Sequence, residues 1–255
     1  MKIKNLGDRA EIYIYGTIID DTDAKWMQAE DGSILGYQFP ADIRQQLKDV
    51  ENLPLLVRIS SYGGDVSAAV AIFNMLKEHN APVTVQIDSI AASAASIIAM
   101  AGNEIIMPEN SFLMIHNPQG GGFGTSDYLL SIVDYLKKLR DMIAGTYEKH
   151  VKNGADVKAL MDAETWINAH DAEEMFDNVR MVDSNDIKAV AKFDVHKLDM
   201  YKNVPDALKE QLKVVDTATE EAIEAEDAEG ADDDADNNNV VVETILEVLK
   251  RSFAK

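Results

Sequence analysis

Cysteine is absent from the 255-residue sequence, and cationic and aromatic residues are scarce. Without cysteine the chain has no disulfide framework, no thiolate metal site and no cysteine nucleophile. Lysine and arginine number 24 against 45 aspartates and glutamates, and the resulting formal charge of −21 argues against a phosphate-backbone partner. No apolar run approaches the roughly 20 residues that span a bilayer. We therefore expect a protein that binds neither nucleic acid nor a membrane.

The negative charge is concentrated in one segment. Residues 216–236 hold eleven aspartates and glutamates and no lysine or arginine. Low-complexity acidic sequence of this kind buries too little apolar surface to fold alone, so we expect it to be disordered. Residues 240–255 regain helical apolar spacing, at Val241, Ile245, Leu246, Leu249 and Phe253. The segment is interpreted either as a tether that presents this helix to a partner or as a solubilising linker.

Three regions are thus predicted: a folded domain over 1–200, a linker with the acidic segment over 201–239, and a short amphipathic helix over 240–255. The start of the chain, residues 1–16, lacks an apolar signal core with a small-residue cleavage site, so a cytoplasmic location is expected.

Within residues 1–200, strand-like and helix-like patterns alternate. Strands are expected over 10–16, 55–59, 83–87, 105–107 and 112–115, and helices over 66–79, 93–101 and 126–151. This alternation favours an α/β fold built from parallel β-α-β units. Residues 26–40 show no clean period and are expected to form a loop or a weakly ordered insertion.

Ser93, within SIAASAASIIAMAG at 89–102, falls where a tight turn passes into a helix. The unpaired N–H groups of a helix N-terminus favour negative charge, such as that on an attacked carbonyl oxygen. Taken alone, a serine at this position is ordinarily a helix N-cap.

His116 ends the apolar strand in FLMIHNPQGGGFG at 112–124, where an imidazole can act as a general base in a cleft. A structural or surface role is the ordinary alternative. The glycines at 120, 121, 122 and 124 fit no phosphate-binding pattern. In SSYGGDV at 60–66, the pair Gly63-Gly64 permits close backbone approach, and an ordinary turn is the alternative.

In combination, SYGG after a strand, AAS opening a small-residue helix, and MIHNP about twenty residues later resemble the Clp proteolytic-subunit family of serine peptidases. That family shows S-P-G-G, G-Q-A-A-S and M-I-H-Q-P in the same order, and the resemblance covers about residues 8–183. It implies Ser93 as nucleophile and His116 as general base. It also implies the N–H groups of Gly64 and Ala94 as the oxyanion hole.

The same resemblance places Glu164 at the position of the third, acidic member, because Trp166 of DAETWINAHDAEE takes the family's aromatic place. The family has aspartate there. Glutamate can still orient His116, since the role needs a positioned carboxylate. Asp162 is the fallback, and a solvated acid beside a helix start is the plain alternative for Glu164.

The family fold implied is the Clp/crotonase-type ββα spiral with a protruding strand-helix handle, followed here by the acidic tail and its terminal helix. The implied reaction is acyl transfer on polypeptide substrates, without a metal or organic cofactor. Subunits of the family assemble into stacked homo-oligomeric rings through the handle.

Several features depart from the housekeeping form: Tyr62 in place of proline, Ser89-Ile90 ahead of AAS, the 26–40 insertion and the acidic extension. The ETW stretch at 164–166, the SYGGDV form at 61–66 and the acidic extension resemble the Clp-related head maturation proteases of phages and prophages, which implies capsid or scaffold substrates and a location in a procapsid. The alternatives are a proteolytic subunit fed by an ATPase unfoldase, a crotonase-like acyl-CoA enzyme, and a catalytically dead assembly protein.

Overall fold

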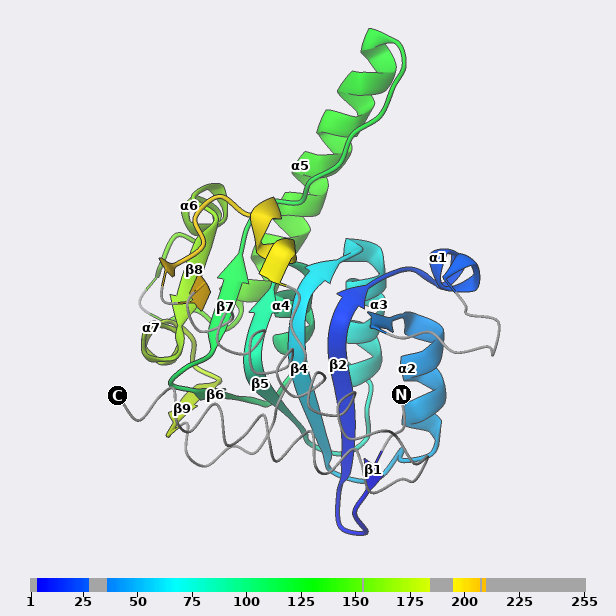
Figure 1. Ribbon diagram of the computed structural model, residues 1–255, viewed down its shortest axis with the longest axis vertical. Helices are drawn as coiled ribbons and strands as arrows, with labels where there is room; N and C mark the ends of the chain where they lie inside the picture. Colours follow the sequence, from blue (N-terminus) through cyan, green and yellow to red (C-terminus); the bar gives the residue numbers. More distant parts are fainter. Residues whose placement is uncertain (1–3, 28–35, 153, 184–194, 207, 210–255) are drawn as a thin grey trace, which may run out of the picture. The chain divides into compact units, whose positions relative to one another are not determined.

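The computed structural model describes residues 4–27, 36–152, 154–183, 195–206 and 208–209 (Figure 1). The chain divides into two compact units, residues 1–187 and 188–255. The described part of the second unit contains one short 3-10 helix, η2 (Val195–Met200). The acidic segment and the 240–255 helix lie outside the described residues, so the three-region division of the sequence stays a prediction.

The first unit is built on a nine-stranded, mostly parallel sheet. Its main path runs β1-β2-β4-β5-β6-β9, while β3 pairs with β2, β7 with β5, and β8 with β7. All pairs are parallel except β1–β2 and β7–β8. The strands are β1 (Lys4–Asn5), β2 (Ala10–Ile18), β3 (Tyr37–Gln38), β4 (Leu55–Gly64), β5 (Val83–Ala92), β6 (Glu104–Pro108), β7 (Phe112–Ile115), β8 (Thr165–Asn168) and β9 (Val179–Val182). The predicted parallel α/β architecture is confirmed.

Helices connect the strands and cover the apolar face of the sheet. They are α1 (Asp21–Trp26), α2 (Pro40–Lys48), α3 (Val66–Lys77), α4 (Ala94–Ala99), α5 (Ser126–Glu148), α6 (Val157–Asp162) and α7 (Ala169–Met175). Alternate residues of β4 and β5, such as Val57 and Val85, are fully buried and share one core cluster with Ile72 of α3 and Ile98 of α4. The period-2 burial of these strands is what a half-covered sheet requires.

Of the insertion over 26–40, the described residues form regular structure only at its two ends and in the two-residue strand β3. Helix α1 ends at Trp26, β3 pairs in parallel with the end of β2, and α2 begins at Pro40. Residues 28–35 lie outside the described residues. These elements escape a periodicity search because two paired residues or one and a half helical turns are too short to show a period.

Strands β4 and β5 also run further than predicted, to Gly64 and Ala92. Their last residues do not alternate in polarity, but the backbone still pairs. Gly64 lies opposite Ile18 of β2, and Ala92 lies opposite Met114 of β7.

On one of its two sides, strand β5 pairs with two different strands in succession. Its first half pairs with β6, at Thr84–Gln86, and its last residues pair with β7, at Ile90–Ala92. Because β5 and β7 are parallel, their carboxyl ends lie side by side. The residues that follow them, Ser93 and His116, are thereby brought together from positions 23 apart in the chain.

Helix α5 projects away from the body of the first unit, and the segment that precedes it runs alongside (Figure 1). The segment lies close to the helix: a Cβ added at Gly122 would meet Ile132 Cδ1 at 2.6 Å and Tyr128 Cε1 at 3.0 Å. Gly122 and Gly124 therefore allow this segment to pack closely against α5. The predicted helix over 126–151 is confirmed from Ser126 to Glu148.

Candidate active site

Ser93 and His116 meet directly. His116 Nε2 lies 2.7 Å from Ser93 Oγ, a hydrogen-bond distance. Ser93 precedes α4, yet its side chain makes no capping hydrogen bond to the helix. The ordinary N-cap role of a serine at this place is thus not adopted, and the hydroxyl is directed to the histidine instead.

Ser93 is also the one residue between Ser89 and Gly102 that is not buried. Both flanking runs are made of small and apolar residues whose side chains pack into the core. The hydroxyl is therefore presented at a surface by a rigid and otherwise buried turn.

The backbone of Ser93 is held in a rare conformation. Its φ is 54° and its ψ is −123°, a region that non-glycine residues seldom occupy. Such a conformation costs of order 1–3 kcal/mol and persists only where the surroundings fix it, most often at functional sites. Here the N–H of Ser93 donates to the carbonyl of Met114 at 2.9 Å, and its carbonyl accepts from Ser96 N–H at 3.0 Å.

Gly63 lies against the nucleophile turn. A Cβ added at Gly63 would come within 2.7 Å of Ala92 O, 2.8 Å of Ser93 Cβ and 2.9 Å of Ala94 N. The N–H of Gly63 donates to Ser61 Oγ at 3.1 Å, so this amide is already engaged. The role of Gly64 N–H as an oxyanion donor stays a prediction.

Gly64 itself has φ 144°, and a Cβ there would collide with Ile18 O at 1.9 Å. Only glycine fits where β4 passes so close to the end of β2. Asp65 then caps α3 through Ala68 N–H at 2.7 Å, which ends the turn.

Glu164 is brought to the same end of the sheet. In the antiparallel β7–β8 ladder Ile115 lies opposite Thr165, so the next residue on each strand is His116 on one side and Glu164 on the other. Glu164 is 9% exposed and has a positive φ of 50°. It follows the C-cap residue of α6, at a left-handed position that glycine or asparagine usually occupies.

Two opposing effects act on the imidazole. Burial of His116 lowers its pKa below the usual 6.5, while the negative charge of Glu164 raises it. Burial is the stronger of the two, so the imidazole is neutral at pH 7. A neutral imidazole whose Nε2 faces a hydroxyl is the form that can accept a proton.

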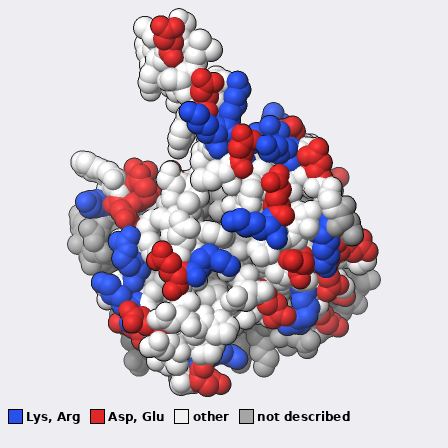
Figure 2. All heavy atoms as spheres, turned by 180° about the vertical axis from the view of Figure 1, so that it is seen from behind, with Lys and Arg blue, Asp and Glu red and all other residues white. Residues whose placement is uncertain are grey.

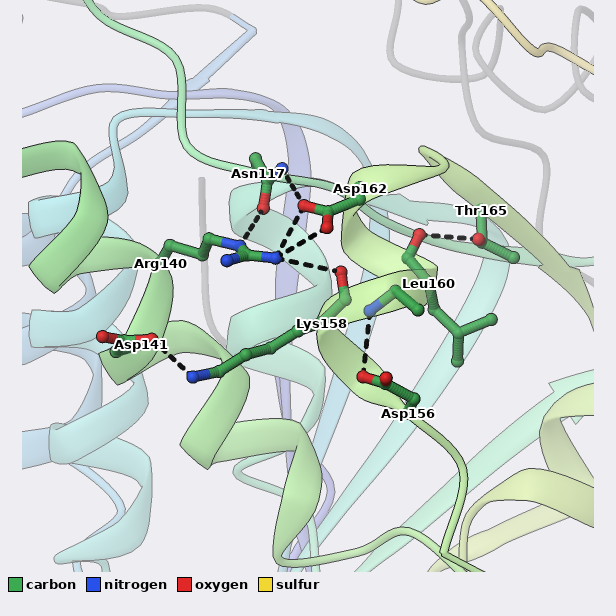
Figure 3. Close-up of polar contacts among 9 residues, drawn as sticks. Asn117, Arg140, Asp141, Asp156, Lys158, Leu160, Asp162 and Thr165 are labelled. Atoms are coloured by element: carbon green, nitrogen blue, oxygen red, sulfur yellow. Dashed lines mark hydrogen bonds and ion pairs between the residues drawn. The ribbon is translucent and has the colours of Figure 1, made fainter. Parts of the chain in front are cut away.

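Asp162, the fallback acid, is committed to other partners (Figure 3). Its two carboxylate oxygens accept from Arg140 Nη2 at 2.7 and 2.8 Å, and Oδ1 also accepts from Asn117 Nδ2 at 2.8 Å. Arg140 Nε donates to Asn117 Oδ1 at 3.0 Å, which closes the ring of three side chains. This arrangement favours Glu164 over Asp162 as the partner of His116.

The ring of Asn117, Arg140 and Asp162 was not expected from the sequence. The ring links three segments. Asn117 follows His116, Arg140 lies in the second half of α5, and Asp162 is the last residue of α6, two residues before Glu164. Lys158 adds a second contact between α6 and α5, since its Nζ lies 2.5 Å from Asp141 Oδ1. Asn117 and Asp162 lie within stretches that the sequence singles out, but nothing in the sequence marks Arg140 as their common partner.

Charged residues also form a cluster on the face of the sheet opposite the one that packs against the helices. Arg58 of β4 donates to both carboxylate oxygens of Asp88 on β5, from Nη2 at 2.6 Å and from Nε at 2.9 Å, and Tyr15 of β2 donates to the same carboxylate. The Asp88 side chain is 1% exposed. The buried carboxylate is stable there because both of its oxygens accept hydrogen bonds. Oδ1 accepts from Arg58, and Oδ2 accepts from Arg58 and Tyr15.

Among the described residues, no group of three or more histidine, aspartate or glutamate side chains is arranged to hold a metal ion. In the same part of the chain, none of the helices combines the length and the apolarity that crossing a membrane requires.

The site is thus a serine–histidine pair on an α/β fold, with a buried acid beside the histidine and glycine-lined backbone beside the serine. In comparisons with known proteins, the family described as Clp protease matches residues 43–179. This range contains Gly64, Ser93, His116 and Glu164.

Curated relatives carry the same family name. An "ATP-dependent Clp protease proteolytic subunit 2" of Treponema denticola is 34% identical over 146 residues, which cover 52% of this chain and 70% of that protein. A proteolytic subunit of Mesostigma viride is 28% identical over 155 residues, 55% of this chain and 68% of the relative. One from Ligilactobacillus salivarius reaches 39% over 88 residues, 33% of this chain and 44% of the relative. The chain belongs to the Clp protease family and is a Clp-type peptidase.

Proposed function

We propose that this protein is a serine endopeptidase in which Ser93 is the nucleophile, His116 the general base and Glu164 the residue that orients His116. The 2.7 Å contact between Ser93 Oγ and His116 Nε2 carries this proposal. The unused capping role of Ser93, its rare backbone conformation and its accessibility support it.

In the first half of the reaction, Ser93 Oγ attacks the carbonyl carbon of a peptide bond while its proton passes to His116 Nε2. The N–H groups of Ala94 and Gly64 donate to the oxyanion. The negative charge of Glu164 stabilises the imidazolium. The C–N bond then breaks, and His116 returns the proton to the departing amine.

In the second half, water attacks the acyl-serine and gives its proton to His116. The tetrahedral species collapses, the ester bond to Ser93 Oγ breaks, and His116 reprotonates Ser93. The products are a new carboxyl end and a new amino end, and the enzyme is restored. No step requires a redox partner or a cofactor.

The proposal includes the Clp/crotonase-type ββα spiral and assembly into stacked homo-oligomeric rings through α5. Large apolar side chains are exposed along this helix and the segment before it: Phe123, Tyr128, Leu129, Leu130, Val133, Tyr135 and Met142. From behind, the distal part of the projection is uncharged apart from an acidic group at its tip, and charged side chains of both signs gather toward its base (Figure 2). Apolar surface of this extent is typical of an interface.

The experiment is hydrolysis of fluorogenic peptides and of an unfolded protein by the purified full-length chain. Wild type is expected to release peptide fragments, and Ser93→Ala and His116→Ala are expected to abolish release while remaining folded. An exposed histidine supplies the matched control, so His170→Ala should retain full activity. Equal activity of wild type and Ser93→Ala would exclude the mechanism, and a catalytically dead assembly protein would show no release at all.

For the biological setting, we propose processing of capsid or scaffold proteins during phage head maturation. The supporting features are Tyr62, Glu164 at the acid position and the acidic extension. A subunit partnered with an ATPase unfoldase is the second candidate, favoured by the names of the relatives. Location follows the setting: a procapsid in the first case, and the cytoplasm in the second.

Two assays, one with a capsid protein and one with an added unfoldase, distinguish the two settings. Cleavage of a co-expressed capsid protein that stops with Ser93→Ala, and needs no ATPase, supports head maturation. Degradation of a folded substrate that needs an added unfoldase and ATP supports the second candidate and excludes the first.

A further inference from the structure

A buried chain of three polar groups connects α5 to the backbone of Ser93. Ser96 Oγ donates to the carbonyl oxygen of Ser93 at 2.6 Å, and the hydroxyl of Tyr147 lies 2.7 Å from Ser96 Oγ. Ser96 is fully buried and Tyr147 is 1% exposed. Neither side chain takes part in the reaction steps described above.

The direction of the two hydrogen bonds is fixed by the protons available. A serine hydroxyl has one proton, and Ser96 gives it to the Ser93 carbonyl, which can only accept. The Tyr147 hydroxyl must then donate to Ser96 Oγ. Burial raises the pKa of Tyr147, so the phenol keeps this proton at neutral pH.

The Ser93 carbonyl matters because of what shares its peptide plane. The carbonyl of Ser93 and the N–H of Ala94 belong to one rigid, planar amide group, so fixing one fixes the other. Ala94 N–H is a proposed oxyanion donor. The carbonyl has two hydrogen bonds from Ser96, one from its N–H at 3.0 Å and one from its hydroxyl at 2.6 Å.

We propose that Ser96 and Tyr147 are positioning residues that hold the Ser93–Ala94 peptide plane so that Ala94 N–H points to the oxyanion. This inference rests on the proposed serine-peptidase function. It assigns the base of α5 a part in the reaction, through one phenol hydroxyl placed 51 residues from Ser96 along the chain.

The test is Tyr147→Phe, which removes one oxygen atom and keeps the ring. Losing an oxyanion donor outright lowers kcat by about 10²–10³-fold, so a misdirected donor should lower it by about tenfold. We expect KM to change less than twofold and the inhibition constant of a peptide boronate, which forms a tetrahedral adduct, to rise in proportion to the loss of kcat. Tyr13→Phe, in β2, removes a phenol hydroxyl that donates to Glu11 Oε2, and it should match wild type in all three measurements.

Ser96→Ala is the second variant and should lower kcat at least as much. Because Tyr147 acts through Ser96, the double variant should be no slower than Ser96→Ala alone. If either single variant fails to fold, as judged by thermal unfolding, the other decides the question.

Wild-type kcat and boronate affinity in a folded Tyr147→Phe or Ser96→Ala variant would overturn the proposal and leave the two hydroxyls a structural role. Failure of the proposed function is distinguishable, since wild type would then show neither peptide hydrolysis nor boronate inhibition.

Discussion

Ser93 Oγ and His116 Nε2 lie 2.7 Å apart at the adjacent carboxyl ends of two parallel strands, β5 and β7. The antiparallel β8 then adds Glu164 beside His116. Three segments that are separate in the sequence thus reach one edge of the sheet through backbone pairing.

Activity should depend on pH through His116. Burial lowers the pKa of this imidazole below its usual 6.5, so kcat/KM should rise with pH, with the midpoint of the rise below pH 6.5, and then level off. In Glu164→Gln the carboxylate that raises the pKa is lost. The rising limb should therefore move to lower pH, while the plateau falls roughly 10²–10⁴-fold. A pH–rate profile of both proteins checks this, and a limb that stays or moves to higher pH in Glu164→Gln would contradict it.

Arg140 should support activity without touching the reacting atoms. Arg140→Met removes the donors to Asn117 Oδ1 and to both oxygens of Asp162, so kcat should fall by about three- to tenfold. Arg140→Lys should recover only part, because the guanidinium donates to Asn117 from Nε and to Asp162 from Nη2, and a single ammonium nitrogen cannot occupy both positions. Lys138→Met on the same helix is the control and should leave kcat unchanged. Wild-type kcat in Arg140→Met would show that the ring is dispensable.

Gly63→Ala should abolish catalysis. The added methyl group would lie 2.8 Å from Ser93 Cβ and 2.9 Å from Ala94 N, at a residue whose φ is 97°. The nucleophile turn must shift or the backbone must strain, and either displaces the hydroxyl from His116. Gly145→Ala in α5 meets open space and should stabilise the helix by about 1 kcal/mol, with no loss of activity. Peptide hydrolysis and denaturant unfolding of both variants test the contrast.

Asp88→Ala should destabilise the fold while leaving the active-site chemistry intact. Its removal leaves Arg58, whose side chain is 15% exposed, without its carboxylate partner, which costs about 3–5 kcal/mol for a buried pair. Asp134→Ala removes an exposed carboxylate and should change the free energy of unfolding by less than about 0.5 kcal/mol. Similar unfolding free energies for the two variants would contradict the importance of the buried cluster.

Much of the fold was predictable because its strands and helices carry strong patterns. The 112–115 strand matches β7 residue for residue, and the start of the long helix at Ser126 was also correct. The ends of β4 and β5 were missed because backbone pairing, which leaves no side-chain period, extends them to the site. The short α1 and β3 were missed because six helical residues and two paired residues are too few to show a period.

The meeting of Ser93 and His116 was predictable only from three motifs taken together, since each residue has an ordinary structural role by itself. The Arg140 ring and the Tyr147–Ser96 contact were not predictable. Their members lie 22 to 51 residues apart along the chain and meet only because α5 returns to the body of the fold.

The most direct test of the account is labelling of the intact protein with a fluorophosphonate, read by intact mass and by peptide mapping. The account predicts one adduct per chain, on Ser93, with none in Ser93→Ala and a greatly slowed reaction in His116→Ala. Absence of labelling in the folded wild type, or an adduct on another residue, would contradict it.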